Sequence, residues 1–147
     1  YLDKSTNQQL TKSARVSFSP HCYSREMKGL DDPQLIVVTE KKGNHSVDRI
    51  FDTDRWNHSI SLAKQLQSIH NISCKRDSDN QVVIYFEKQD RYRQSNGWYT
   101  FIRIQIDPKY PDILQLEVRT THRRPNHPSS AKYPLRFNQH VADILSA

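Results

Sequence analysis

One group of residues has types and spacing that fit metal-ion chemistry. Asp32 precedes an apolar run at residues 34–39, and Glu40 and Lys42 follow it in the stretch DDPQLIVVTEKK. If the run is a strand, carboxylates stand at both of its ends, where their oxygens could bind Mg²⁺ while the lysine steadies an attacking water. A metal-dependent nuclease is therefore one candidate function. The competing interpretation is a Glu-Lys-Lys group that is simply solvated at a hairpin turn.

The histidines and cysteines show no metal-ligand or catalytic spacing. The chain has seven histidines and two cysteines, Cys22 and Cys74, without a Cys-x-x-Cys pair or a His-x-x-x-His pair. We therefore expect no metal site, no cofactor and no catalytic residue. Two cysteines allow at most one disulfide, and we expect reduced thiols and an intracellular location, nuclear or cytoplasmic.

Basic and aromatic residues gather in two segments that could contact nucleic acid. The net charge of +6 favours an acidic partner. Arginines and aromatic rings together can bind phosphates and stack on bases. The expected contacts lie in or beside loops 91–93 and 121–136 and comprise Arg91, Arg93, Trp98, Arg123, Arg124 and Lys132. The same residue types also form hot spots between proteins, so nucleic-acid binding is kept as an alternative.

The elements that would position these residues fit one domain preceded by an arm. The chain has 147 residues, of which 35% are apolar, and these cluster in short periodic runs. Residues 1–33 are polar and irregular, and we expect an arm or linker whose RVSFSP stretch could dock as a short edge strand. Residues 34–147 are expected to form a single domain. No apolar run approaches the roughly 18 residues of a membrane span, so we expect no membrane partner.

The periodicity of the apolar residues predicts a hairpin and two helices. Two β-branched runs surround the turn-forming KKGN stretch, which predicts a hairpin over residues 34–51. Residues 55–70 change to helical spacing, with Thr53 or Asp54 as the expected N-cap. The expected buried stripe of this helix is Trp56, Ile60, Leu62, Ala63, Leu66 and Ile69. The end of the chain shows helical spacing again, from Phe137 to Leu145.

Further strands are expected at residues 81–88, 98–106 and 113–121. The last two alternate strictly, which is typical of a sheet with one wet face and one face on a core. The expected inward residues are Thr100, Ile102, Ile104, Ile106, Leu114, Leu116, Val118 and Thr120. Residues 122–134 contain three prolines, and we expect no regular structure there. This order predicts an α+β fold in which helices pack on one face of an antiparallel meander.

Residues 62–118 resemble the RWD domain, the non-catalytic relative of the ubiquitin-conjugating fold. The stretch LQSIH resembles the end of the family's helix, VVIYF and FIRIQI resemble its strands, and DPKYP resembles its Tyr-Pro turn. The proline that usually follows a few residues later is missing, since Ile113 and Leu114 stand there. The resemblance implies that the turn at Tyr110 braces a strand crossing beneath the helices. No cysteine follows Cys74, which excludes the thioester chemistry of the conjugating enzymes.

The resemblance implies a non-catalytic module that recruits a protein partner within a kinetochore, ubiquitin-ligase or signalling assembly. The expected partner-binding residues lie on the wet face of the sheet and in the following loop: Phe101, Arg103, Gln105, Glu117, Arg119, Arg123 and Arg124. Nucleic-acid binding and the metal-dependent nuclease are the two alternatives. The sequence leaves open the partner, the pathway, the oligomeric state, whether the chain is a fragment, and glycosylation of its Asn-x-Ser triplets.

Overall fold

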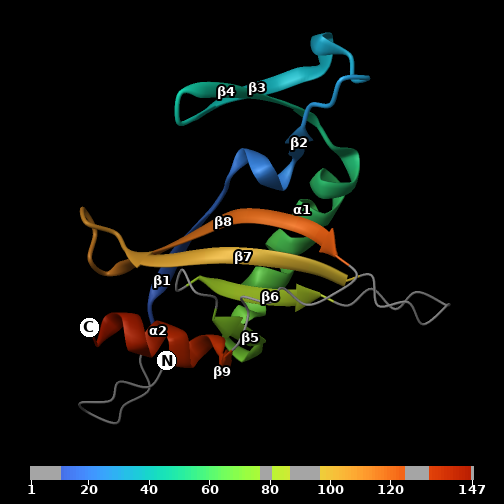
Figure 1. Ribbon diagram of the computed structural model, residues 1–147. Helices are drawn as coiled ribbons and strands as arrows, with labels where there is room; N and C mark the ends of the chain where they lie inside the picture. The colour runs from blue at the N-terminus through green and yellow to red at the C-terminus, as the bar shows by residue number, and fades with distance from the viewer. Residues whose placement is uncertain (1–10, 77–80, 87–96, 125–132, 147) are drawn as a thin grey trace, which may run out of the picture.

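Alternating apolar residues in the second half of the chain build the larger of two sheets. The computed structural model describes residues 11–76, 81–86, 97–124 and 133–146. Its six-stranded sheet has the order β1-β8-β7-β6-β5-β9, in which β1 runs parallel to β8 and all other neighbours are antiparallel (Figure 1). The strands are β1 (Ser13–Phe18), β5 (Ser73–Arg76), β6 (Val82–Phe86), β7 (Gly97–Ile106), β8 (Ile113–Arg124) and β9 (Tyr133–Arg136).

A smaller, three-stranded antiparallel sheet lies apart from the larger one and is drawn above it in Figure 1. Its order is β2-β4-β3, and its strands are β2 (Ser24–Glu26), β3 (Ile36–Lys42) and β4 (His45–Phe51). The predicted hairpin is therefore confirmed. Gly43 turns the chain between β3 and β4 with a φ of 64°, a conformation that glycine adopts without a steric penalty. Two short 3-10 helices, η1 (Pro20–Cys22) and η2 (Pro33–Leu35), precede β2 and β3.

Both helices cover the same face of the six-stranded sheet. They are α1 (Thr53–Gln65), which continues as the 3-10 helix η3 (Leu66–Asn71), and α2 (Phe137–Leu145). One buried cluster joins Leu62 of α1, Val141 of α2 and the strand residues Ile102, Leu116 and Val118. The predicted α+β class with helices against an antiparallel-rich sheet is thus confirmed. Similarity to the RWD fold is not shown.

Helix α1 differs from its prediction in cap, length and buried face. The N-cap is Asp52, whose side chain accepts a hydrogen bond from the amide of Arg55 at 3.0 Å. The α-helix ends at Gln65, and the expected last turn is the 3-10 segment η3. Its buried residues are Ser59 and Leu62, whereas Trp56 and Ile60 are 44% and 50% exposed. The helix therefore carries two apolar stripes, and only one of them faces the core.

A β-bulge interrupts the alternation that was expected along β8. Phe101 pairs with Thr120 but Ile102 pairs with Val118, so Arg119 is an extra residue in the ladder. The bulge reverses the faces beyond it. Thr121, not Thr120, is therefore buried beside Thr100, with 3.2 Å between their hydroxyl oxygens. Ile106, expected inside, is exposed at the end of β7.

The proline-rich segment also holds more structure than expected. Strand β8 continues through His122 to Arg124, and β9 contains Pro134. Proline removes one ladder donor, but β9 lies at the edge of the sheet, where a missing donor is tolerated. The short strands β5 and β9 were not predicted, because neither is long enough to show an apolar period.

The turn between β7 and β8 is organised by Asp107 rather than by Tyr110 and Pro111. The Asp107 carboxylate is buried and accepts hydrogen bonds from the amides of Lys109 at 2.9 Å and Tyr110 at 3.1 Å and from the Gln115 side chain at 2.7 Å. Tyr110 is itself exposed. The expectation that Tyr110 braces a crossing beneath the helices is therefore wrong.

Part of the expected N-terminal arm is integrated into the two sheets. Residues 13–18 form the edge strand β1, and the amide of Ser19 donates to the carbonyl of Val118 at 2.9 Å. Residues 24–26 pair with β4 in the smaller sheet. Among the described residues, no helix is long and apolar enough to cross a membrane.

Candidate interaction surface

Three aromatic rings from three different elements meet on the surface where the smaller sheet joins α1. The Trp56 ring in the first turn of α1 lies 6.1 Å from the Phe51 ring and 6.5 Å from the Tyr23 ring, measured between centroids. Tyr23 follows η1, and Phe51 ends β4. Phe51 and Trp56 are both 44% exposed, so this is an apolar contact area that remains open to solvent.

Ile60 extends this area along the helix. It stands one turn after Trp56, and residues four apart lie on the same side of a helix. Ile60 is exposed as well. We call Tyr23, Phe51, Trp56 and Ile60 the aromatic surface. Sequence analysis missed it because Trp56 and Ile60 share helical spacing with the buried residues, and a spacing pattern does not say which of two stripes meets the core.

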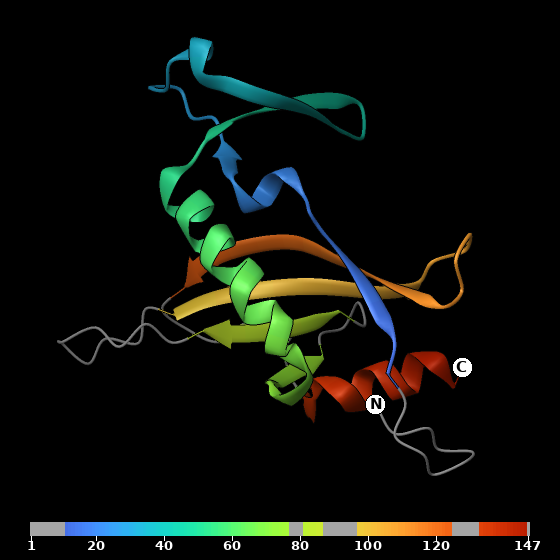
Figure 2. The same ribbon diagram turned by 180° about the vertical axis from the view of Figure 1, so that it is seen from behind.

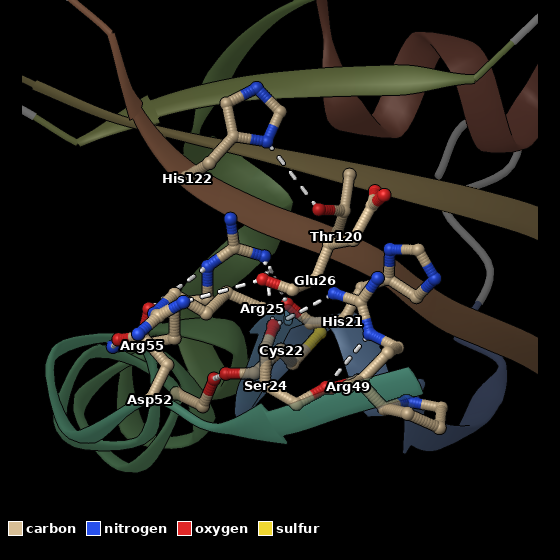
Figure 3. Close-up of polar contacts among 12 residues, drawn as sticks. His21, Cys22, Ser24, Arg25, Glu26, Arg49, Asp52, Arg55, Thr120 and His122 are labelled. Carbon is tan, nitrogen blue, oxygen red and sulfur yellow. Dashed lines mark hydrogen bonds and ion pairs between the residues drawn. The ribbon is translucent and has the colours of Figure 1, made fainter. Parts of the chain in front are cut away.

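A buried arginine connects the two strands beneath the aromatic surface. Arg49 of β4 is 5% exposed, and its guanidinium donates to both the hydroxyl and the carbonyl oxygen of Ser24, each at 2.9 Å. Ser24 pairs with Phe51 in the ladder and its hydroxyl donates to the carbonyl of Pro20 at 2.7 Å. These bonds fix η1, β2 and β4 relative to one another (Figure 3).

A second arginine, Arg55, connects η1 and β2 to α1. Arg55 donates to the carbonyls of His21 and Ser24, each at 3.0 Å, and its guanidinium lies 3.7 Å from the carboxylate of Asp52. Burial lowers the pKa of Arg55, and the neighbouring Asp52 carboxylate opposes that shift. Ser59 adds a bond from its hydroxyl to the carbonyl of Cys22 at 2.6 Å. The elements that bear Tyr23, Phe51 and Trp56 are therefore held by directed polar contacts.

Two carboxylates, those of Glu40 and Asp31, complete the polar junction around Ser24, Arg49 and Arg55. The Glu40 carboxylate lies 2.8 Å from the Nε2 atom of His21 and 3.8 Å from the Arg49 guanidinium. Arg25 binds both carboxylate oxygens of Asp31 at 2.7 Å, and this lowers the pKa of Asp31 to about 2. The carboxylates of Asp31 and Glu40 thus lie beside Arg25 and Arg49 and offset the positive charges that the strands bring together.

The partner-binding residues predicted on the sheet do share one face. Phe101, Arg103 and Gln105 lie on the face of β7 away from the helices, and Glu117 faces Arg103 across the ladder at 3.8 Å. Gln105 donates to the side chain of Gln115 at 2.8 Å. This face is open at Arg103 and Gln105, whereas Tyr99 and Val83 on the same face are buried. The polar side chains of the open part are already paired with one another, and the role predicted for this face stays a prediction. Arg119 stands exposed at the bulge.

Of the six residues predicted for nucleic acid, the three that the structure describes lie at one end of β7 and β8. Trp98 stacks on His58 of α1, with 4.4 Å between ring centroids, so it lies on the helix side of the sheet. Arg123 pairs with Trp98 in the ladder and Arg124 pairs with Gly97. Arg91, Arg93 and Lys132 fall outside the described residues. Nucleic-acid binding therefore stays a prediction.

The three residues of the nuclease alternative are not brought together. The Asp32 side chain caps η2 by accepting from the amide of Gln34 at 2.9 Å. Glu40 is held by His21 and Arg49 near the far end of β3, and Lys42 is exposed beside the hairpin turn. Ile36, the first residue of β3, is already about 13 Å from Glu40 in strand geometry, and Asp32 precedes Ile36 in the chain. The described part of the chain contains no group of three metal-binding side chains.

The comparisons with known proteins place the chain in a family other than the expected one. No curated protein and no solved structure gives a significant match. The RWD resemblance covered only residues 62–118, and the match to a different family model across nearly the whole chain overturns it. That model is described as the YjaZ family and matches residues 1–145, so the chain belongs to the YjaZ family.

Proposed function

We propose that this chain is a protein-interaction module that recruits its partner through the aromatic surface. The observation that carries the proposal is the aromatic cluster at the end of the smaller sheet, in which Phe51 and Trp56 are exposed and Tyr23 is half-buried. Tryptophan and tyrosine are enriched among the residues that dominate binding energy between proteins. Their rigid rings provide a large contact area with few rotatable bonds to immobilise.

The polar junction supports the same proposal, because it fixes the surface before a partner arrives. Arg49 and Arg55 together make four hydrogen bonds to groups of η1 and β2 at distances of 2.9–3.0 Å. A surface that is already ordered loses less conformational entropy on association. The aromatic surface is therefore suited to binding with little rearrangement of its backbone.

The test compares Trp56→Ala with Asn57→Ala in capture of partners from a native extract treated with nuclease. Asn57 is the next residue of α1 and is also exposed, so it controls for a change in this turn of the helix. We expect the wild type and Asn57→Ala to retain the same protein after nuclease treatment. Trp56→Ala should weaken its affinity at least about thirtyfold, the loss expected for a hot-spot residue.

Thermal melting accompanies the binding measurement. Trp56 is half exposed, so its replacement should change the melting temperature by only a few degrees. Equal retention of the partner by Trp56→Ala and Asn57→Ala would contradict the proposed surface. Loss of everything retained after nuclease treatment would instead support nucleic acid as the ligand.

A further inference from the structure

An apolar groove of about 600 Å³ opens on the helix side of the six-stranded sheet, and none of the residues of the aromatic surface lines it. Its walls come from β1, α1, η3, β8 and α2, and include Val16, Leu66, Leu116 and Phe137. Figure 2 shows α1, β1 and α2 surrounding the part of the sheet where these residues lie. The volume falls within the roughly 300–1,000 Å³ of small-molecule sites.

The groove exists because small residues stand where larger ones would fill it. Ala14 of β1 and Ala63 of α1 both line the groove and both are exposed. Val16 is also 39% exposed, although its neighbours Leu114 and Leu116 on β8 belong to the buried cluster. The core is thus continuous with the groove floor, and apolar side chains remain in contact with solvent until another molecule covers them.

The rim of the groove carries a positive charge. The polar lining residues are Thr11, Lys12, Gln67 and Asn138, and no carboxylate lines the groove within the described residues. The Lys12 ammonium donates to the carbonyl of Pro111 at 3.4 Å and pairs with Asp112 at 3.1 Å. The Asp112 side chain is 98% exposed, and such surface pairs contribute little, so a ligand carboxylate can replace it.

We propose that this groove binds a free alkyl-chain monocarboxylate, with the chain against the apolar walls and the carboxylate on Lys12. A groove of this volume with apolar walls can hold an alkyl chain, and Lys12, the one cation among the described lining residues, matches a single anionic head group. The site is independent of the proposed protein-binding function, since it shares no residue with the aromatic surface.

Isothermal titration calorimetry of the full chain with octanoate, decanoate and dodecanoate, each below its micelle concentration, tests the proposal. Each buried methylene should tighten binding about fourfold. The methyl ester of dodecanoate lacks the charge and should bind about tenfold more weakly than the acid. Absence of binding, or affinity that does not rise with chain length, would overturn the proposal.

Two variants locate the site, each with a control. Ala63→Phe fills the groove and should abolish dodecanoate binding, whereas Lys64→Phe places the same ring at the next, exposed position of α1 and should bind normally. Lys12→Gln should bind acid and ester equally, which removes the tenfold preference. Unchanged binding by Ala63→Phe overturns the assignment. So does a wild type that fails to bind and sediments as a dimer that Ala63→Phe dissociates, because a second copy would then cover the groove.

Discussion

At the scale of single residues, the most unusual environment is that of His140 on α2. Its side chain is 1% exposed, and neither ring nitrogen has a hydrogen-bond partner among the described residues. Burial lowers the pKa of His140, the positive charge of Arg76 lowers it further, and Asp143 partly opposes the shift. A buried polar ring without partners destabilises the fold, because folding removes it from water without replacing its hydrogen bonds.

We predict that His140→Leu stabilises the protein at neutral pH. An apolar side chain of similar size removes the unsatisfied nitrogens, and the free energy of unfolding should rise by about 1 kcal/mol. Urea unfolding followed by circular dichroism measures the change. His45→Leu, at an exposed position of β4, is the control and should leave stability within about 0.5 kcal/mol. A less stable His140→Leu protein would show that the imidazole makes a favourable contact.

The pH dependence of stability follows from the same burial. The pKa of His58 is lowered to about 4 by burial, and that of His140 is lowered as well. Because the folded pKa values lie below the unfolded value near 6.5, the unfolded chain binds more protons in this range. Stability should therefore be complete above about pH 6.5 and fall as the pH drops toward 4. Melting temperatures from pH 7.5 to 4.5 check this, and His140→Leu should lose less over that range than the wild type.

At the scale of elements, the polar junction should determine whether the smaller sheet stays attached. Arg49→Met keeps the length of the side chain but removes the donors to Ser24 and the charge facing Glu40. We expect a loss of about 2–3 kcal/mol, with faster hydrogen exchange in β2 and β4 than in β7. The control is Arg103→Met, whose exposed pair with Glu117 should contribute less than about 1 kcal/mol. Equal effects of the two variants would contradict the role of Arg49.

The turn between β7 and β8 offers a matched pair of aspartates. Asp107→Ala removes the acceptor for two backbone amides and for Gln115, and should lower the melting temperature by several degrees. Asp112→Ala, in the same turn but almost fully exposed, should change it little. Hydrogen bonds from Gln115 and the amides lower the pKa of Asp107, so its contribution is present above the unfolded pKa and is lost as the pH falls through the folded one. Similar melting temperatures of both variants would show that the prolines, and not Asp107, stabilise the turn.

The sequence predicts an element well where its apolar alternation extends over many residues. It predicts the buried face poorly where two sides of an element are both apolar. The strands predicted over 98–106 and 113–121 and the hairpin predicted over 34–51 follow from alternation and turn residues, and the structure contains all three. The side that Trp56 faces does not follow, since α1 has two apolar stripes and only the packed structure selects one. The bulge at Arg119 also lacks a local signal, because it depends on pairing with β7.

At the scale of the whole molecule, the two cysteines report whether its parts unfold together. Both thiols are buried, Cys22 beside β8 and Cys74 in β5. Burial raises the pKa of each to about 11, which suppresses the reactive thiolate. We predict that the native protein resists dithiobis-nitrobenzoate at pH 8 and that both thiols react at one rate set by global unfolding. Peptide mapping of partly modified protein checks this, and earlier labelling of Cys22 would show that the N-terminal strands open separately.

The fold class of the whole molecule was predictable from the sequence, but the aromatic surface was not. Alternating strands followed by helical spacing indicate an α+β fold, because each element must bury one face against another layer. A binding surface requires side chains that the core leaves outside, and these are known only after packing. Tyr23 lies far from Phe51 and Trp56 in the sequence, and the bonds of Ser24, Arg49 and Arg55 bring their elements together.

The most direct test of partner binding by the aromatic surface places a photo-crosslinking amino acid, p-benzoylphenylalanine, at one surface position at a time. Position 60 lies on the aromatic surface, and position 103 lies on the open face of the larger sheet. After irradiation with the captured partner, we predict a covalent adduct from position 60 and none from position 103. Adducts from position 103 alone would show that the partner binds the face of the larger sheet and would contradict binding through the aromatic surface.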